Sequence, residues 1–421
     1  MIARILQSLT GIRDEERRTA LLSFAFFFFV LAGYYILRPL REDMGVAGGV
    51  RNLPWLYLAN LLTMLALAQI FGAVATRFPR RVFIPSVYRF VMATLIAFYA
   101  VVHFAPESWD VSLGRFFYVW ISVLNMWIVS LFWAVMADVW GLDGGKRLFG
   151  FIAMGGTVGA IVGSSLTTTL VDVIGRMNLV LVSVVFFEFA VRCVSTLAHR
   201  LDLAPLSGRA EKRGGLMSGI TATVRSPYLL GIAVFLALYS LSSTFLYFAK
   251  ANIVADESSN RITRTILFAN IDLVTNIATL LLQLLVAGRL MPRIGVGRTL
   301  LILPVVTALG FTALGLYPLF PVLVVFEALR RALNYAIARP ARETLFTVVT
   351  RDEKYKAKSF IDTFVYRGGD MLGATGFGAL TGAGVGLAGV AFTAVPIAAL
   401  WGGIGLALCA ALRRRATVPT D

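Results

Sequence analysis

Twelve apolar runs, each long enough to cross a lipid bilayer, constrain this chain more than any other feature. A helix needs about 20 apolar residues to span the hydrocarbon, and these runs are continuous, whereas membrane strands would alternate. Only 15% of the residues are charged and 58% are hydrophobic, whereas soluble domains carry about a quarter charged residues. We therefore expect an all-α membrane protein with twelve transmembrane helices. The runs cover 20–38, 53–76, 82–105, 113–140, 147–171, 178–198, 227–250, 264–288, 296–317, 320–339, 359–382 and 388–411.

The widest polar gap follows the sixth run and divides the chain into two six-helix halves. This gap is rich in basic residues and contains "SGRAEKRGG". The expected domains are an interfacial segment at 1–19, an N-terminal half at 20–198, a linker at 199–226, a C-terminal half at 227–411 and a tail at 412–421. Most lysines and arginines fall in the tails, the linker and alternate gaps. Since cytoplasmic loops carry such residues, we expect cytoplasmic termini in a bacterial inner membrane.

The two halves resemble each other at corresponding gaps. The gap after the second run reads "GAVATRFPRRVFIP", and the gap after the eighth reads "AGRLMPRIGVGRTLLILP". Lysine-bearing turns, "DGGKRLFGF" and "RDEKYKAKSF", join the fourth run to the fifth and the tenth to the eleventh. Two parallel six-helix repeats with a midplane substrate site between them are the plan of the major facilitator fold. We expect that fold, with transport by alternating access.

The first run leads into "YYILRPLRED". With a cytoplasmic N-terminus, this stretch lies at the outer end of the helix, where the positive-inside bias does not explain two arginines. Pro39 disfavours helix continuation. If the helix continues, Tyr34, Arg38 and Arg41 share one face. A cationic, aromatic-flanked face at the outer mouth suits anion capture. Snorkelling, or ion pairing with Glu42 or Asp43, is the alternative.

The tenth run carries charges near the expected midplane, where ionisable residues are costly and mark functional sites. It reads "FEALRRALNYAIARPARE". Glu327 can pair with Arg331, and Arg330 with Asn334, at i, i+4 spacing. One acid cannot neutralise both arginines, and a guanidinium fork suits phosphate or carboxylate. These arginines either bind an anionic ligand or form a structural ion pair with Glu327.

Other charged residues of the runs are candidates for coupling or gating. Asp272 lies on a polar stripe with Asn276 and Gln283, and serves either interhelical hydrogen bonding or proton transfer. Asp138 is a candidate gate with Lys146, with Arg147 or with a basic residue of the other half. Arg367 and Asp370 can pair at i, i+3, and we interpret Glu188 with Arg192 as a structural pair. Tyr239 and Tyr247 share a face with Lys250, and they either stack on a base or form an aromatic belt beside a snorkelling Lys250. We expect the glycines of "GGTVGAIVG" and "GGDMLGATGFG" to allow close helix packing.

The remaining features exclude several classes of protein. The net charge of +16 is accounted for by cytoplasmic loops, so no nucleic-acid partner is expected. The two cysteines and two histidines form no metal or disulfide spacing. No Walker sequence and no catalytic triad pattern occurs, so we expect no enzyme and no cofactor. The expected partners are the bilayer and a small anionic solute, bound by a monomer.

Four motifs together resemble the ATP/ADP translocases of plastids and intracellular bacteria and their shorter bacterial relatives. These are "ILRPLREDMGV", "ADVWG", "GKRLFGF" and "KAKSFIDTFVYRGGD". The resemblance places Arg41 where the family has a lysine, Asp138 at a glutamate of the fourth helix, Arg367 at a basic residue of the eleventh, and Asp272 at an acid of the eighth. Asp370 stands where a lysine is usual, which leaves open whether the solute is a nucleotide or another anion.

We therefore expect a secondary transporter for an anionic, phosphorylated, nucleotide-like solute. Arg38, Arg41, Arg330, Arg331 and Arg367 would supply positive charge, and Asp138 and Asp272 would couple transport to a gate or a proton. The alternatives are a proton-coupled exporter of drugs or lipids and a membrane sensor or assembly factor that transports nothing.

Overall fold

The chain divides into two units, each built of packed helices. The computed structural model describes residues 13–75, 80–201, 216–285, 287–350, 357–358 and 360–416, which contain no strand. Unit 1 comprises Met1–Gly49, Ala59–Arg209 and Ser258–Asn276; unit 2 comprises Val50–Leu58, Ala210–Glu257 and Ile277–Asp421. Each of the two helices α3 (Leu53–Ala75) and α9 (Arg261–Leu285) therefore contributes residues to both units.

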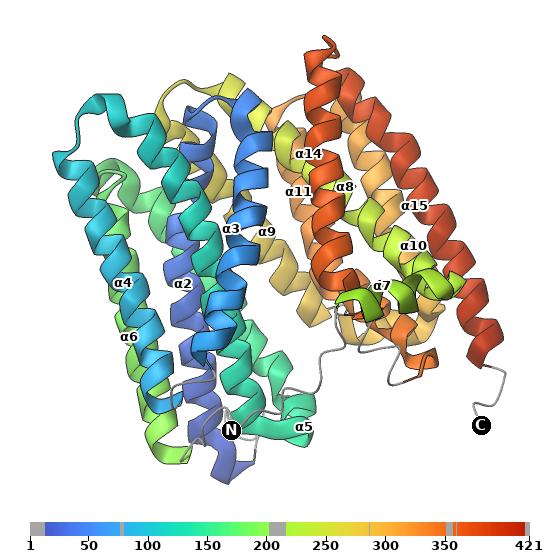
Figure 1. Cartoon of the computed structure of the whole chain (residues 1–421), viewed down its shortest axis with the longest axis horizontal. Coiled ribbons are helices and arrows are strands. Elements are labelled where there is room, and N and C mark those ends of the chain that lie inside the picture. Colours follow the sequence, from blue (N-terminus) through green and yellow to red (C-terminus); the bar gives the residue numbers. More distant parts are fainter. Residues whose placement is uncertain are drawn as a thin grey trace. The chain divides into compact units, whose positions relative to one another are not determined.

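Unit 1 is built around its first long helix, α2 (Arg17–Ala47), which follows the 3-10 turn η1 (Asp14–Glu16). α2 packs along α5 (Asp110–Ile174) and α6 (Asn178–Leu201), and α4 (Arg80–Phe104) packs on α6 (Figure 1). The 3-10 turns η2 (Val50–Asn52) and η3 (Glu107–Trp109) precede α3 and α5. The core is aromatic, with Phe27 stacked on Phe132 at 4.0 Å between ring centroids.

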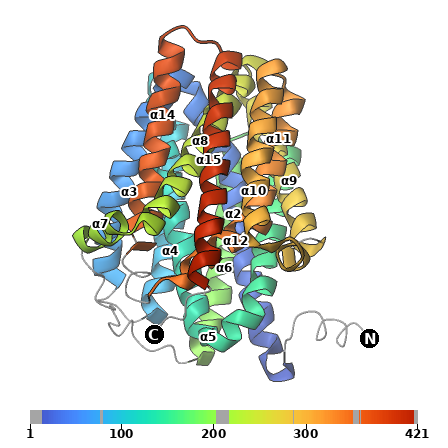
Figure 2. The ribbon, with the colours of Figure 1, turned by 90° about the vertical axis from the view of Figure 1, so that its right-hand side faces the viewer.

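Unit 2 contains the helices of the second half. They are α7 (Leu216–Arg225), α8 (Pro227–Glu257), α10 (Ala287–Leu316), α11 (Phe320–Leu333), α12 (Arg339–Thr344), α14 (Tyr366–Gly382) and α15 (Leu387–Ala416). Between them lie the π-helical turns η4 (Asn334–Ala338) and η6 (Ile361–Val365) and the 3-10 turn η5 (Leu345–Val348). α15 packs on α8 and α10, and Figure 2 shows it between α14 and α10.

The described helices correspond to the twelve predicted spans. Nine helical stretches of the described residues are long and apolar enough to cross a membrane. The other three predicted spans correspond to α3, to the segment α11–η4–α12 that a π-helical turn divides, and to α14, which has 17 residues. Of the predicted linker, 216–225 forms α7, and 202–215 lie outside the described residues. The surface helix expected within 1–12 also lies outside them.

Helix α2 is longer than predicted, since we expected the first span to end near residue 38. It continues to Ala47, with Pro39 inside it. Proline removes one backbone donor, but membrane helices tolerate this loss when neighbouring groups compensate. Beyond Pro39, Leu40 and Met44 are buried in the core. The predicted helix end is wrong because tertiary packing outweighs the local preference of proline.

Two of the predicted gaps are kinks at single glycines. Gly141 has φ 58° and interrupts α5 between the fourth and fifth spans. Gly295 has φ 79° and interrupts α10 at the start of the ninth span. Only glycine adopts such positive φ values without strain, so each helix turns there without an extended loop.

Glycines bring helices into close contact in both units, as predicted. In unit 1, a Cβ atom added at Gly159 or Gly163 of α5 would lie 2.2 or 2.4 Å from a backbone oxygen of α2. In unit 2, a Cβ atom added at Gly369 of α14 would lie 2.6 Å from a backbone oxygen of α8. Small residues permit such backbone contact between helices. The first helix of each half thus packs on the fifth helix of that half.

Candidate functional site: buried arginines

Arg38 of α2, whose side chain is 14% exposed, forms an ion pair with a buried carboxylate in unit 1. Its Nη1 lies 3.0 Å from Oδ1 of Asp272 on α9 and donates a hydrogen bond to the Tyr35 hydroxyl at 3.3 Å. The guanidinium also lies over the Tyr35 ring, 5.3 Å from its centroid. Tyr34 is buried, and its ring meets that of Tyr35 edge-on at 5.5 Å. Arg38 therefore lies within the helix and is paired, whereas we predicted a cation at an outer helix end.

Arg41 lies one turn further along α2. Its guanidinium sits over the ring of Tyr118 on α5, 4.4 Å from the centroid, and its Nη1 is 3.5 Å from Oε1 of Glu42. The Arg41 side chain is 12% exposed and that of Glu42 5%. An aromatic face and a carboxylate together stabilise this buried charge. The ion pair with Glu42 is the alternative that the sequence left open.

Asp43 is the centre of a charge cluster that the sequence did not single out. Its carboxylate is fully buried and accepts hydrogen bonds from Arg176 at 2.5 Å, Arg264 at 2.8 Å and Arg261 at 3.2 Å. Arg261 also donates to Asp110. Arg176 lies between two spans. Burial is the main cause that lowers the pKa of its guanidinium, and repulsion from Arg261 is the second. Asp43 thus connects α2 to the start of α9 within unit 1.

Arg330 of α11 is buried in unit 2 with 3% of its surface exposed. Nε donates to the Thr307 hydroxyl at 3.1 Å, and Nη2 donates to Ser242 at 2.9 Å and Ser243 at 3.0 Å. The Tyr239 ring lies 5.3 Å from the guanidinium carbon. Within the part of the chain that the structure describes, no carboxylate lies within ion-pair distance of Arg330 and Nη1 has no hydrogen-bond partner.

Glu327, one turn before Arg331 on α11, is shared between two cations. Its Oε1 lies 3.6 Å from Nη1 of Arg331 and 3.6 Å from Nζ of Lys250 on α8. The Lys250 side chain is only 3% exposed, so the prediction that it snorkels is wrong. Nζ lies 5.1 Å from the centroid of the Tyr247 ring. The carboxylate attracts Lys250 into the protein, although Lys250 lies 77 positions before it in the sequence.

Asp370 of α14 accepts hydrogen bonds from two hydroxyls and a guanidinium. The donors are Ser240, Thr244 at 3.2 Å and Arg367 at 3.2 Å. The predicted pair between Arg367 and Asp370 is therefore confirmed. Ser240 and Thr244 lie on α8, so Asp370 joins α14 to α8 beside the glycine contact. The Arg367 side chain remains 40% exposed.

The remaining predicted residues are dispersed. Arg147 donates to both carboxylate oxygens of Glu16, at 2.8 and 3.2 Å, and Asp138 is exposed on α5. The side chain of Lys146 lies outside the described residues.

Asn334 begins the π-helical turn η4, where the backbone widens, and such turns are frequent at functional sites. The predicted pair of Glu188 with Arg192 is confirmed at 3.1 Å. Within the described residues, no group of three potential metal ligands occurs.

The sequence matches no protein-family model and no curated protein. Among solved structures, the chain is similar to the nucleoside transporter NupG, with 16% identity, coverage of 94% of this chain and 99% of that one, and a TM-score of 0.64. It is also similar to a POT family transporter in complex with a thioalcohol-conjugated peptide, with 11% identity, coverage of 95% of this chain and 97% of that one, and a TM-score of 0.65. A third similar structure is the bacterial homolog of the human lysosomal transporter Spinster, with 14% identity, coverage of 94% of this chain and 99% of that one, and a TM-score of 0.60.

These similarities extend over nearly the whole length of each chain and define the fold. The chain has an all-α fold of the major facilitator type, as the repeated halves predicted, and nine helical stretches of its described residues are long and apolar enough to cross a membrane. At 11–16% identity the likeness shows the arrangement of the helices and does not identify a solute.

Proposed function

We propose that the chain is a secondary transporter that moves an anionic, phosphorylated solute across the inner membrane by alternating access. Its two termini would lie in the cytoplasm. The observation that carries the proposal is Arg330. Charged side chains inside a membrane protein are costly and mark substrate pathways, and Arg330 is surrounded by hydroxyls, with no carboxylate partner among the described residues.

The geometry of Arg330 supports anion binding. Nε and Nη2 are anchored by Thr307, Ser242 and Ser243, which leaves Nη1 to donate to a ligand. A planar guanidinium with fixed orientation suits phosphate and carboxylate oxygens. Neutral hydroxyls stabilise the cation without cancelling its charge, so an anion would gain a charge-assisted hydrogen bond.

The finer proposal is a nucleotide-like solute. It rests on the resemblance of "ILRPLREDMGV" and "KAKSFIDTFVYRGGD" to the ATP/ADP translocases. We propose that Arg41, Arg331 and Arg367 contribute positive charge, that Tyr34 and Asn334 line the solute path, and that Asp138, Lys146 and Arg147 act in gating. Arg38 and Asp272, which pair with each other, and Glu327 and Asp370, which also pair with cations, would couple transport to helix movement.

A thermal-shift screen of the purified full chain tests this proposal. The panel contains nucleotides, sugar phosphates, inorganic phosphate, carboxylates and lipids, because a ligand of the native state raises its apparent stability. We expect the largest shift from a phosphorylated compound, and we expect Arg330→Gln to abolish it. Arg192→Gln is the matched control, because this substitution also removes one positive charge, but from a side chain that is 71% exposed.

A different pattern would overturn the proposal. Shifts produced only by lipids or apolar cations, and unchanged in Arg330→Gln, would favour the exporter of drugs or lipids. Arg330→Lys refines the test: it retains the charge but loses the fork, so it should retain part of the stability and little of the phosphate-dependent shift.

A further inference from the structure

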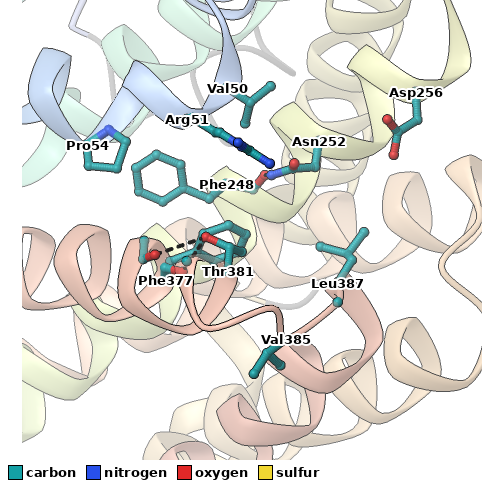
Figure 3. A pocket seen from close by; sticks show the side chains of 13 residues that line it. Val50, Arg51, Pro54, Phe248, Asn252, Asp256, Phe377, Thr381, Val385 and Leu387 are labelled. Atoms are coloured by element: carbon teal, nitrogen blue, oxygen red, sulfur yellow. Dashed lines mark hydrogen bonds between the residues drawn. The ribbon is translucent and has the colours of Figure 1, made fainter.

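A cavity of about 500 Å³ lies inside unit 2, at the ends of α8 and α14. It is formed by η2 and the start of α3, by the last turns of α8 and α14, and by the turn before α15 (Figure 3). Asn252, which lines it, follows Ser243 by nine residues on α8, or about 13 Å along the helix axis. The cavity is therefore separate from the Arg330 cluster. A volume of this size suits a small molecule.

Two opposite charges line this cavity without pairing. Arg51 and Asp256 are both exposed. Neither forms an ion pair or side-chain hydrogen bond with any residue that the structure describes. Figure 3 shows the Arg51 side chain directed towards Asn252, with Asp256 one turn further along α8. Isolated surface charges are ordinarily only solvated. Here a cation and an anion line one cavity, together with the amide of Asn252.

The polar atoms between the two charges are acceptors. The Asn252 amide nitrogen donates to the Phe248 carbonyl at 2.8 Å, which leaves the amide oxygen for a ligand. The Thr381 hydroxyl donates to the carbonyls of Phe377 and Gly378 at 3.0 and 3.1 Å, so its oxygen can only accept further bonds. Together with the Asp256 carboxylate, these oxygens suit an ammonium group, whereas Arg51 suits a carboxylate.

The rest of the lining is apolar and open. Phe248 and Phe377 stack with ring centroids 5.2 Å apart, and Val50, Val385 and Leu387 complete the wall. A Cβ atom added at Gly382 or Gly386 would meet no atom within 4 Å. The cavity can therefore hold an apolar side chain beside the two charged ends of a ligand.

We propose that this cavity is a second, peripheral binding site for a small zwitterion with an apolar side chain, such as an amino acid. The ligand carboxylate binds Arg51, and its ammonium group binds Asp256 and the oxygens of Asn252 and Thr381. The side chain packs on Val385 and Leu387. This site does not depend on Arg330 or on transport of a phosphorylated solute.

Isothermal titration calorimetry on the purified full chain tests the site with L-phenylalanine as the probe. Phenylacetate and phenethylamine, which each keep one charge, are the comparison ligands. We expect L-phenylalanine to bind at least about tenfold more tightly than either, since a charge-assisted hydrogen bond contributes that much affinity. Arg51→Gln and Asp256→Asn should each weaken L-phenylalanine binding by a similar factor.

Three controls make the result decisive. Arg192→Gln and Arg330→Gln should leave L-phenylalanine binding unchanged, and Gly382→Leu should weaken it by filling open space. Because Arg51 and Asp256 are exposed and unpaired within the described residues, their variants should keep the melting temperature of the parent protein. Absence of L-phenylalanine binding at millimolar concentration, equal binding of the two singly charged analogues, or binding that survives both charge substitutions would overturn the proposal.

Discussion

Arg38 in unit 1, with a side chain 14% exposed, and Arg330 in unit 2, which is 3% exposed, both lie on apolar helices, and their polar partners differ. Arg38 contacts a carboxylate, that of Asp272, at 3.0 Å. Arg330 contacts the hydroxyls of Ser242, Ser243 and Thr307. A carboxylate cancels the charge of its partner, whereas a hydroxyl only solvates it. This difference is why we propose Arg330, and not Arg38, as the arginine that binds an anion.

Asp43 extends the comparison between the units. In unit 1, one buried carboxylate accepts hydrogen bonds from Arg176, Arg261 and Arg264, so each of these arginines contacts an acid. In unit 2, Lys250 and Arg331 both lie within ion-pair distance of Glu327, and Arg367 lies within that distance of Asp370. Among the described residues, neither of these acids is within ion-pair distance of Arg330. Burial alone therefore does not identify a ligand-binding arginine.

The largest effect is expected from Asp272→Ala. This change leaves Arg38 buried without its carboxylate, and breaking a buried pair in this way costs about 3–5 kcal/mol. Chemical denaturation in detergent measures the loss. The double variant Arg38→Met with Asp272→Leu should recover most of it, because two apolar residues leave no uncompensated charge. A single variant as stable as the parent would mean that Arg38 is solvated as Arg330 is, and the comparison would fail.

A smaller effect is expected from Ser242→Ala. It removes one neutral hydroxyl from Arg330, and a hydrogen bond to a charged group contributes about 1.5–3 kcal/mol. Thermal unfolding measures the stability, and added phosphorylated ligand should offset part of the loss by supplying oxygens to the guanidinium. Ser243→Ala provides a second measurement at the same nitrogen. An effect as large as that of Asp272→Ala would show that the hydroxyls act as a carboxylate does.

The smallest effect is expected at the surface pair of Arg147 with Glu16. The two side chains are 33% and 23% exposed, and pairs of this kind contribute about 0.2–1 kcal/mol and weaken with salt. Glu16→Gln should lower the melting temperature slightly at low ionic strength and not at all in 1 M salt. A salt-independent loss comparable to that of Ser242→Ala would place this pair among the buried ones.

Much of the fold follows from the sequence because membrane helices satisfy their own backbone and are continuous in the chain. The pairs at i, i+3 and i, i+4 spacing, Arg367 with Asp370 and Glu188 with Arg192, were predictable for the same reason. The glycine-rich segments also predicted close helix contacts correctly. Each of these features depends on residues that are near one another in the sequence.

The errors involve partners that are far apart in the chain. Arg38 meets Asp272, Lys250 meets Glu327 and Asp43 meets Arg264, and no local spacing indicates any of these pairs. Helix α2 passes Pro39 because its continuation is packed and ion-paired in unit 1. A signal for the Asp43 cluster existed in the spacing of Arg261 and Arg264 at the start of a span, but their common partner lies on another helix.

The most direct test of the central claim is solute flux through the reconstituted protein. The solute that gives the largest thermal shift is loaded outside proteoliposomes, and its uptake is compared for the parent protein, Arg330→Gln and Arg192→Gln. We predict uptake by the parent and by Arg192→Gln, and a rate at least about tenfold lower for Arg330→Gln, because a charge-assisted hydrogen bond to the solute is lost. Equal rates for the parent and Arg330→Gln, or no flux of any phosphorylated solute through the parent, would contradict the account.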